Sequence, residues 1–211
     1  SMSRCHSDDL RARRDASSPM TMPALPSATS LTNCWKPSRA AGAIEAIADK
    51  LLKAEHPMLL AEYAGRRPNG FNNIVELAET TGSAVWDVNN ALNFPNKHPL
   101  CLSMDKQSLK HTDLIVGLDV KDWEKQLVEL NNAKRIMEPL PPKNCDYVEI
   151  GFAELNISKW AMDYCRMQPC SVRAIGDTQI AIPALTKMLK EDISKSPKLA
   201  TKIEKRTKAI A

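Results

Sequence analysis

The sequence lacks paired cysteine motifs and long apolar runs. Its cysteines are scattered without a C-x-x-C pair, which argues against a structural zinc site and a disulfide scaffold and favours free thiols in a reducing cytoplasm. No apolar run approaches the roughly 20 residues of a membrane span, and the polar stretch 7–16 is unlike a signal peptide. We therefore expect a cytoplasmic protein with no membrane partner. The six cysteines are Cys5, Cys34, Cys101, Cys145, Cys165 and Cys170.

Positive charge is also modest, and much of it lies at the two ends. The formal net charge is +4, and no aromatic residues interleave with the basic clusters as base-stacking platforms would. This pattern predicts solvated tails and excludes nucleic acid as a partner. The clusters are Arg4, Arg11, Arg13 and Arg14 at one end, and Lys198, Lys202, Lys205, Arg206 and Lys208 at the other.

A large fraction of the sequence can nevertheless form a core. Hydrophobic residues make up 43% of the 211 residues, enough for one domain of ordinary size. Residues 1–37 are rich in proline and serine and have no apolar periodicity, so we expect a mobile, disordered or extended linker. The domain is predicted to span residues 38–194. Residues 195–211 are predicted to be a lysine-rich helical tail or linker with little to bury.

Within the predicted domain, helical and strand patterns alternate. Alternation of this kind predicts βαβ units with right-handed crossovers. The sequence therefore predicts an α/β protein, a Rossmann-like three-layer sandwich with a five- or six-stranded parallel sheet. Helices are expected at 39–54, 71–81 and 120–131 and again from Ile180 to Leu189, and strands at 58–61, 84–88, 113–118, 147–150 and 171–175.

The order of short motifs resembles one known family. The chain resembles the central domain of thiamine-diphosphate-dependent enzymes of the acetolactate synthase and oxalyl-CoA decarboxylase type, over about residues 40–192. Each motif alone is weak, and the segment 94–100 is the most informative. The motifs are Pro57-Met58-Leu59-Leu60, Leu77-Ala78-Glu79, Phe94-Pro95-Asn96-Lys97-His98-Pro99-Leu100, Asp113-Leu114-Ile115-Val116-Gly117, Ile175-Gly176-Asp177 and Pro183-Ala184-Leu185.

The resemblance implies that two cofactor-holding domains of such an enzyme are missing from this chain. One would carry the glutamate that activates the thiazolium, and the other a Gly-Asp-Gly motif with an asparagine for Mg²⁺ and diphosphate. Gly176-Asp177 is followed by Thr178 and does not match that motif. Thiamine diphosphate and Mg²⁺ would then belong to the parent enzyme, with no cofactor in this chain. The missing pyrimidine- and diphosphate-binding domains become its expected partners, together with a possible homo-oligomer.

In some members of the resembled family the central domain binds FAD or ADP in a crevice at the sheet edge. By resemblance, the positions in such a crevice would be Gly65, Gly117, Asp119, Gly176 and Asp177. The first loop has only one glycine, and Glu62 would place a carboxylate near phosphate, an unfavourable pairing. FAD binding is therefore not expected.

Other candidate residues have simpler interpretations. His98, between Pro95 and Pro99, is expected to be a turn residue with a hydrogen-bonded ring rather than a catalytic base. Cys165 and Cys170 are expected to be unpaired thiols. Trp86, Trp123 and Trp160 are expected to pack in the core or against a neighbouring domain rather than to stack on a ligand.

Two functions remain open. The chain is expected to be an isolated structural domain of a thiamine-diphosphate-dependent enzyme, such as a 2-oxo acid decarboxylase or carboligase, and inactive alone. The alternative is a free-standing nucleotide-binding domain for FAD or ADP, because the edge of a parallel sheet is a general ligand site.

Overall fold

The computed structural model describes residues 37–88, 91–103, 105–152 and 168–210. The expectations for residues 1–36, for Trp160 and for Cys165 lie outside these ranges. The elements are α2 (Pro37–Lys53), β1 (Pro57–Ala61), η1 (Ala64–Arg66), α3 (Gly70–Thr81), β2 (Ala84–Asp87), η3 (Ser108–His111), β3 (Leu114–Leu118), α4 (Trp123–Leu127), β4 (Val128–Asn131), β5 (Ile136–Pro139), β6 (Asp146–Ile150), β7 (Val172–Ala174), α5 (Thr178–Lys195) and α6 (Pro197–Ile210).

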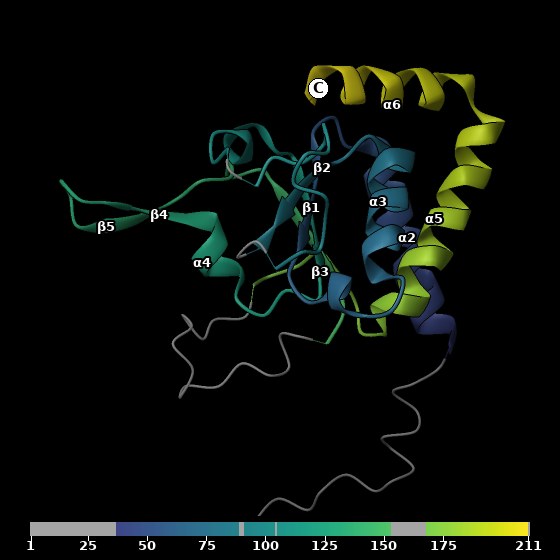
Figure 1. The fold of residues 1–211 in the computed structure, drawn as a ribbon, viewed down its shortest axis with the longest axis horizontal. Helices are drawn as coiled ribbons and strands as arrows, with labels where there is room; N and C mark the ends of the chain where they lie inside the picture. Colours follow the sequence, from purple (N-terminus) through teal and green to yellow (C-terminus); the bar gives the residue numbers. More distant parts are fainter. Residues whose placement is uncertain (1–36, 89–90, 104, 153–167, 211) are drawn as a thin grey trace, which may run out of the picture. The chain divides into compact units, whose positions relative to one another are not determined.

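The centre of the fold is a five-stranded parallel sheet with the order β2-β1-β3-β6-β7. The strands β1 and β3 are apolar and buried along their whole length, as strands covered on both faces must be. The predicted α/β fold with a five-stranded parallel sheet flanked by helices is therefore confirmed (Figure 1).

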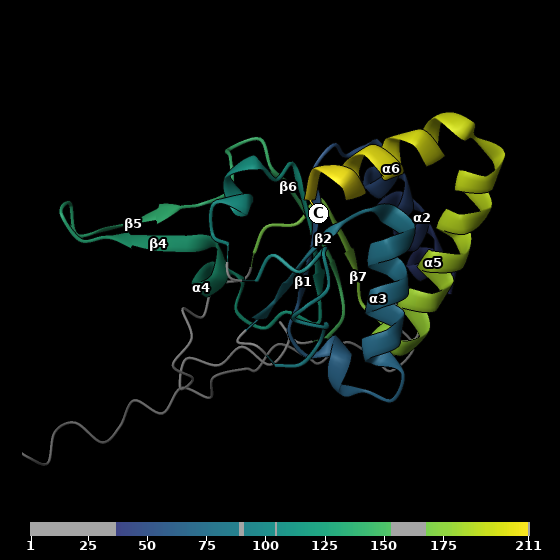
Figure 2. The ribbon, with the colours of Figure 1, turned by 45° about the horizontal axis from the view of Figure 1, so that its top comes forward.

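One face of the sheet is covered by α2, α3 and α5, which lie together on the same side in both ribbon views (Figure 1, Figure 2). Each helix buries an apolar stripe against this face; Ile47, Ile74 and Leu185 have no exposed surface. Helix α3 ends at Gly82, whose φ of 60° allows its N–H to reach Ala78 O. This face holds the larger core.

The other face has a thinner cover, and here the sequence prediction was wrong. A helix was expected over 120–131, but α4 ends at Leu127 and the chain continues as β4, which pairs antiparallel with β5. The side chain of Asp122 accepts a hydrogen bond from Lys125 N and so begins the helix. From Val128 on, residues pair across a hairpin, and this tertiary pairing overrides the helical periodicity.

Helix α6 packs beside the amino ends of the strands. The basic segment 195–211 was expected to have little to bury, yet Arg206 is only 6% exposed. Leu199, Lys202, Ile203 and Ile210 are partly buried on the same helix, at spacings of three and four residues. The segment is thus a docked helix.

The described residues include neither a candidate membrane helix nor a candidate metal-ligand cluster. No helix among them is both long and apolar enough to cross a membrane. Nor does any group of three or more His, Cys, Asp or Glu side chains in this part of the chain lie in a position to hold a metal ion.

Candidate functional site

The carboxyl edge of the sheet is the candidate ligand site. Sequential strands run outward in opposite directions from β1 and β3, which makes the gap between these two strands the topological switch point. In open α/β sheets, ligands bind in the crevice outside the strand ends at such a point. The loops that follow β1 and β3 therefore decide what this crevice can hold.

These two loops are hydrogen-bonded directly to each other. The N–H groups of Glu62 and Tyr63 donate to Leu118 O and Asp119 O, both at 3.3 Å. The carboxylate of Glu62 accepts a hydrogen bond from Lys121 N at 2.7 Å, and the Glu62 residue is only 7% exposed. The Lys121 N–H group, which could otherwise donate to a phosphate oxygen, therefore already donates to the protein's own carboxylate.

Asp119 ties the next strand end into the same network. Its Oδ1 atom accepts from Phe152 N at 2.8 Å and its Oδ2 atom from the Thr178 hydroxyl at 2.7 Å. Its own N–H donates to Ile150 O at 2.9 Å. The φ of Asp119 is 52°, a left-handed conformation that aspartate tolerates better than most residues. A side chain at Gly151, which has a φ of 146°, would collide with the Asp119 carboxylate.

Asn93 fills the space above Gly65. Its side chain donates to Glu62 O at 2.9 Å and accepts from Gly65 N at 2.8 Å, and the residue has no exposed surface. Asp87, at the end of β2, holds the same amide group at 2.7 Å. The close backbone approach that Gly65 permits is thus used by Asn93 rather than left for a ligand.

The remaining predicted positions, Gly117, Gly176 and Asp177, have different surroundings. Gly117 lies within β3, and a Cβ atom there would collide with the Trp123 ring, so this glycine serves core packing. Asp177 begins α5 by accepting from Gln179 N at 2.9 Å. Gly176 is more open, because no other described residue lies within 4 Å of where its Cβ atom would be.

Together these residues do not fit the phosphates of a dinucleotide. Two carboxylates, those of Glu62 and Asp119, accept from backbone N–H groups at the switch point. The sequence placed Gly65, Asp119 and Asp177 at this edge but missed Asn93. The nearest signal for Asn93 was its position directly before the Phe94-Pro95 pair.

A second hollow lies at the opposite, amino edge of the sheet. It has a volume of about 320 Å³ and lies among the starts of β1 and β2, the loop around His111 and helix α6. Its walls include His56, Asp105, Arg206 and Ile210. Arg206 of α6 bounds it on one side.

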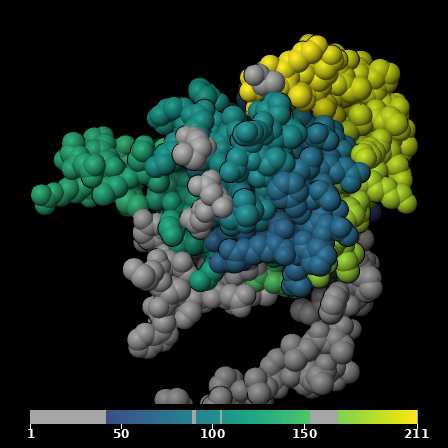
Figure 3. Space-filling view, in the orientation of Figure 1, coloured from purple at the N-terminus to yellow at the C-terminus, as the bar shows by residue number. Residues whose placement is uncertain are grey.

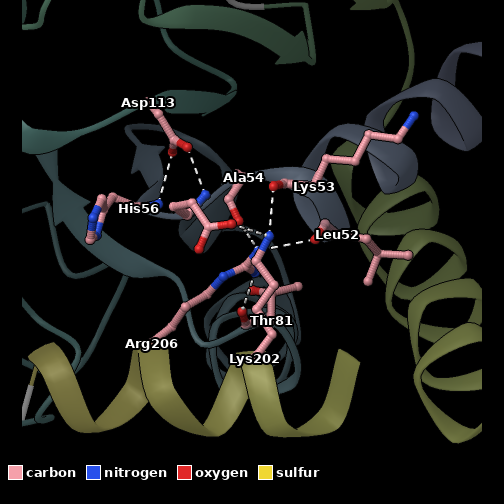
Figure 4. Close-up of polar contacts among 9 residues, drawn as sticks. Leu52, Lys53, Ala54, His56, Thr81, Asp113, Lys202 and Arg206 are labelled. Carbon is pink, nitrogen blue, oxygen red and sulfur yellow. Dashed lines mark hydrogen bonds and ion pairs between the residues drawn. The ribbon is translucent and has the colours of Figure 1, made fainter. Parts of the chain in front are cut away.

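Two cations of α6 cap the carboxyl ends of two helices (Figure 4). Arg206 donates to Leu52 O at 3.1 Å and to Ala54 O, where α2 ends, and to Thr81 O at 3.1 Å, where α3 ends. Lys202 donates to Lys53 O at 2.7 Å. The last carbonyls of a helix have no partner within it and carry its negative dipole end, so cations are favourable there.

Charge and burial shift the pKa values in this cluster. Burial lowers the pKa of the Arg206 guanidinium below its ordinary value, and the charge of Glu55 opposes this shift. The hydrogen bond from Lys202 lowers the pKa of Glu55, whose carboxylate lies 2.7 Å from the Lys202 ammonium. Asp113 accepts from the N–H groups of Glu55 and His56 at 2.6 and 2.9 Å (Figure 4). The cluster holds α2, β1 and α6 together.

The remaining candidates have ordinary structural surroundings. The His98 ring accepts from Leu100 N at 3.2 Å, lies 3.3 Å from Glu79 Oε1 and contacts Phe94 edge-on, as expected for a hydrogen-bonded turn residue. Trp123 has no exposed surface and packs, as expected, in the smaller buried cluster between the sheet and α4, which we call the second core. Cys101 and Cys145 are free thiols, and the Cys170 sulfur accepts a hydrogen bond from Arg173 Nη2 at 3.5 Å.

Comparison with known proteins supports the fold. No protein-family model matches the sequence, and no curated protein matches it. One similar solved structure is an enzyme from Mycobacterium smegmatis assigned as thiamin diphosphate-dependent, with 20% identity and a TM-score of 0.50. Another is the thiamine diphosphate-dependent 4-hydroxybenzoylformate decarboxylase of Rhodococcus jostii RHA1, with 16% identity and a TM-score of 0.50.

Each match covers 70% of this chain but only 27% of the solved chain. The chain therefore has the fold of a part of these thiamine-diphosphate-dependent enzymes, with the size of one domain.

Proposed function

We propose that this chain is the central, structural domain of a thiamine-diphosphate-dependent enzyme of the acetolactate synthase type, and that it is not catalytic alone. The observation that carries the proposal is the closed switch point, where Glu62, Asn93 and Asp119 bind the backbone groups that a nucleotide would need. The order of sequence motifs and the fold shared with part of two such enzymes point to the same kind of domain.

In this function the domain braces the two domains that hold the cofactor. Thiamine diphosphate and Mg²⁺ would be bound by those domains, so this chain supplies no group to the reaction. Its contribution is a rigid sheet whose edges are fixed by internal hydrogen bonds. The parent reaction would be decarboxylation or carboligation of a 2-oxo acid, or a related reaction of an acyl-CoA.

The coding sequence on either side of this segment tests the proposal. We expect an upstream region with the activating glutamate and a downstream region with Gly-Asp-Gly and an asparagine. An open reading frame without either motif would contradict the proposal. Calorimetry of the chain with thiamine diphosphate and Mg²⁺ should give no saturable heat, and a micromolar site would equally contradict it.

The alternative function is a free-standing domain that binds FAD or ADP. The open surroundings of Gly176 at the start of α5 favour it, because backbone N–H groups at a helix start attract phosphate. Against it, a phosphate at Lys121 N would lie about 4 Å from the Glu62 carboxylate, and the repulsion is about 4 kcal/mol per charge pair at an effective dielectric constant of ~20. Protein that is purified yellow, with FAD bound, would favour the alternative.

A further inference from the structure

The hollow at the amino edge of the sheet, which we call the amino-edge hollow, has an apolar floor. Met58 and Ala84 are cross-strand partners at the starts of β1 and β2, and both are buried. Leu102 and Ile210 also line the hollow and are partly buried against the second core. In the space-filling view, the yellow atoms of α6 adjoin the teal atoms of the segment that follows β2 at the top of the molecule (Figure 3). The volume of about 320 Å³ lies at the small end of the range for ligand pockets.

The hydroxyl and guanidinium donors in the wall of this hollow are already engaged. The Ser108 hydroxyl donates to Asp105 O at 2.6 Å, and the Thr112 hydroxyl donates to Ser108 O at 3.0 Å. Both terminal nitrogens of Arg206 donate to helix carbonyls. The Arg206 Nε atom has no partner, but it is buried beyond the reach of solvent. These groups therefore offer a ligand no accessible free donor.

The groups that remain at the rim are acceptors. Asp105 is exposed, and its Oδ1 atom accepts a single hydrogen bond, from Gln107 N at 3.0 Å. A carboxylate has room for further donors, and among the described residues no cation pairs with this one. His56 and His111 are exposed wall residues whose rings are not engaged in the described part of the chain, and each neutral ring has one accepting nitrogen. Figure 4 shows the His56 ring turned away from the capping cations.

The fixed charges around the hollow favour a cation. The Arg206 guanidinium is surrounded by the carbonyl ends of α2 and α3, which carry the negative ends of the helix dipoles. Glu55, another wall residue, lies 2.7 Å from the Lys202 ammonium. These charges are balanced by the groups that they contact, which leaves the Asp105 carboxylate as the uncompensated charge of the described wall. An anionic ligand would meet this carboxylate, whereas an ammonium group would be attracted to it.

We propose that the amino-edge hollow binds a small amphipathic amine. The ammonium group donates to the Asp105 carboxylate and to the accepting nitrogen of a rim histidine, and the apolar body of the ligand packs on the floor. The hollow lies at the edge of the sheet opposite the closed crevice, so this site is independent of nucleotide binding. A small ligand in an open hollow makes few contacts, and we expect a dissociation constant on the order of 0.1–1 mM.

A titration followed by methyl NMR tests the proposal on the full chain at about pH 7.5, where a free histidine ring is mostly neutral and an alkyl amine is charged. Three probes share one ring and differ in the polar group: phenethylamine, phenethyl alcohol and phenylacetate. Phenethylamine should shift the methyl signals of Met58, Ala84, Leu102 and Ile210 saturably, while Ile74 and Leu185 on the other face of the sheet should not respond. Phenethyl alcohol should bind at least about fivefold more weakly, because it lacks the charge, and phenylacetate should not saturate.

Asp105→Asn tests the rim charge. Asparagine keeps an oxygen for the Gln107 N–H group but removes the negative charge, so the dissociation constant for phenethylamine should rise by about two- to fivefold, as for an exposed ion pair. The matched control is Asp49→Asn, which changes an exposed aspartate of α2 outside the hollow and should leave the affinity unchanged. Far-ultraviolet circular dichroism checks that both variants are folded.

Three outcomes overturn the proposal. One is the absence of saturable shifts at the floor methyl groups up to about 10 mM phenethylamine, well above the expected dissociation constant. The others are phenylacetate or phenethyl alcohol binding as tightly as the amine, and an Asp105→Asn variant that binds phenethylamine as the native chain does. None of these results bears on the cofactor tests of the proposed function, which concern the opposite edge of the sheet and the missing domains.

Discussion

Replacing Arg206 by methionine removes the guanidinium that caps α2 and α3 while keeping most of the apolar stem. Three carbonyl oxygens, those of Leu52, Ala54 and Thr81, lose a charged donor. A hydrogen bond to a charged group contributes about 1.5–3 kcal/mol, but water can reach part of the vacated site and the desolvation of the guanidinium is recovered. We therefore expect a net loss of about 2–4 kcal/mol in the free energy of unfolding, less than the sum of three such bonds.

Urea denaturation followed by tryptophan fluorescence measures this loss. For a slope of about 2 kcal/mol per molar urea, the midpoint should fall by roughly 1–2 M. The matched control is Lys205→Met, which removes a neighbouring exposed cation of the same helix and should change stability by less than about 0.5 kcal/mol. If Arg206→Met behaved like this control, the capping role of α6 would be refuted.

Three further predictions follow from individual contacts. Gly117→Ala should destabilise the domain by about 1–3 kcal/mol in the same denaturation assay, because the added methyl group overpacks the second core against a buried indole ring. Burial raises the pKa of the Cys145 thiol to about 12, so iodoacetamide at pH 8 should label Cys101 much faster than Cys145, as peptide mass spectrometry would show; equal labelling would contradict the packing of this thiol. Burial alone would raise the pKa of Asp146, but hydrogen bonding, foremost from Lys50 at 2.6 Å, holds that pKa below its ordinary value. A carboxyl group whose pKa is lowered in the folded state stabilises the fold at pH values above its ordinary pKa, and this contribution is lost as the pH falls through the lowered pKa. Asp146→Asn should therefore flatten the decline in the free energy of unfolding below about pH 4. An unchanged decline in this variant would count against the ion pair.

The sheet was predictable because its central strands carry their own signal. The apolar runs 57–61 and 114–118, each followed by turn residues, allow little except buried parallel strands. The end of α3 at Gly82 was equally legible, since glycine is the usual residue after a helix.

The failures have a common physical cause, which is that long-range contacts outweigh local patterns. The segment 128–139 has helical spacing at its start, but cross-strand pairing makes it a hairpin. The basic segment at 197–210 looked solvated because its main buried group is an arginine. Only the carbonyls of α2 and α3, distant in sequence, give Arg206 a reason to be buried.

The nucleotide crevice stays a prediction, and the structure shows contacts at this edge of the sheet that the sequence did not indicate. Glu62 was recognised as a carboxylate unfavourable to phosphate, which agrees with its place beside Lys121 N. No local pattern indicates that Asn93, 28 residues beyond Gly65, occupies the space above that glycine. Such filling depends on how the loop after β2 folds back, and spacing alone does not encode it.

A fluorescence titration with FAD tests the central claim most directly, namely that this domain fills its own crevice and binds no nucleotide there. The comparison is between the native chain and a variant with Glu62, Tyr63 and Ala64 all changed to glycine, with circular dichroism to verify folding. We predict no saturable binding to the native chain up to several hundred micromolar, since the lost interactions would move a micromolar site to about the millimolar range. Saturable binding of FAD to the native chain at micromolar concentration would contradict the account.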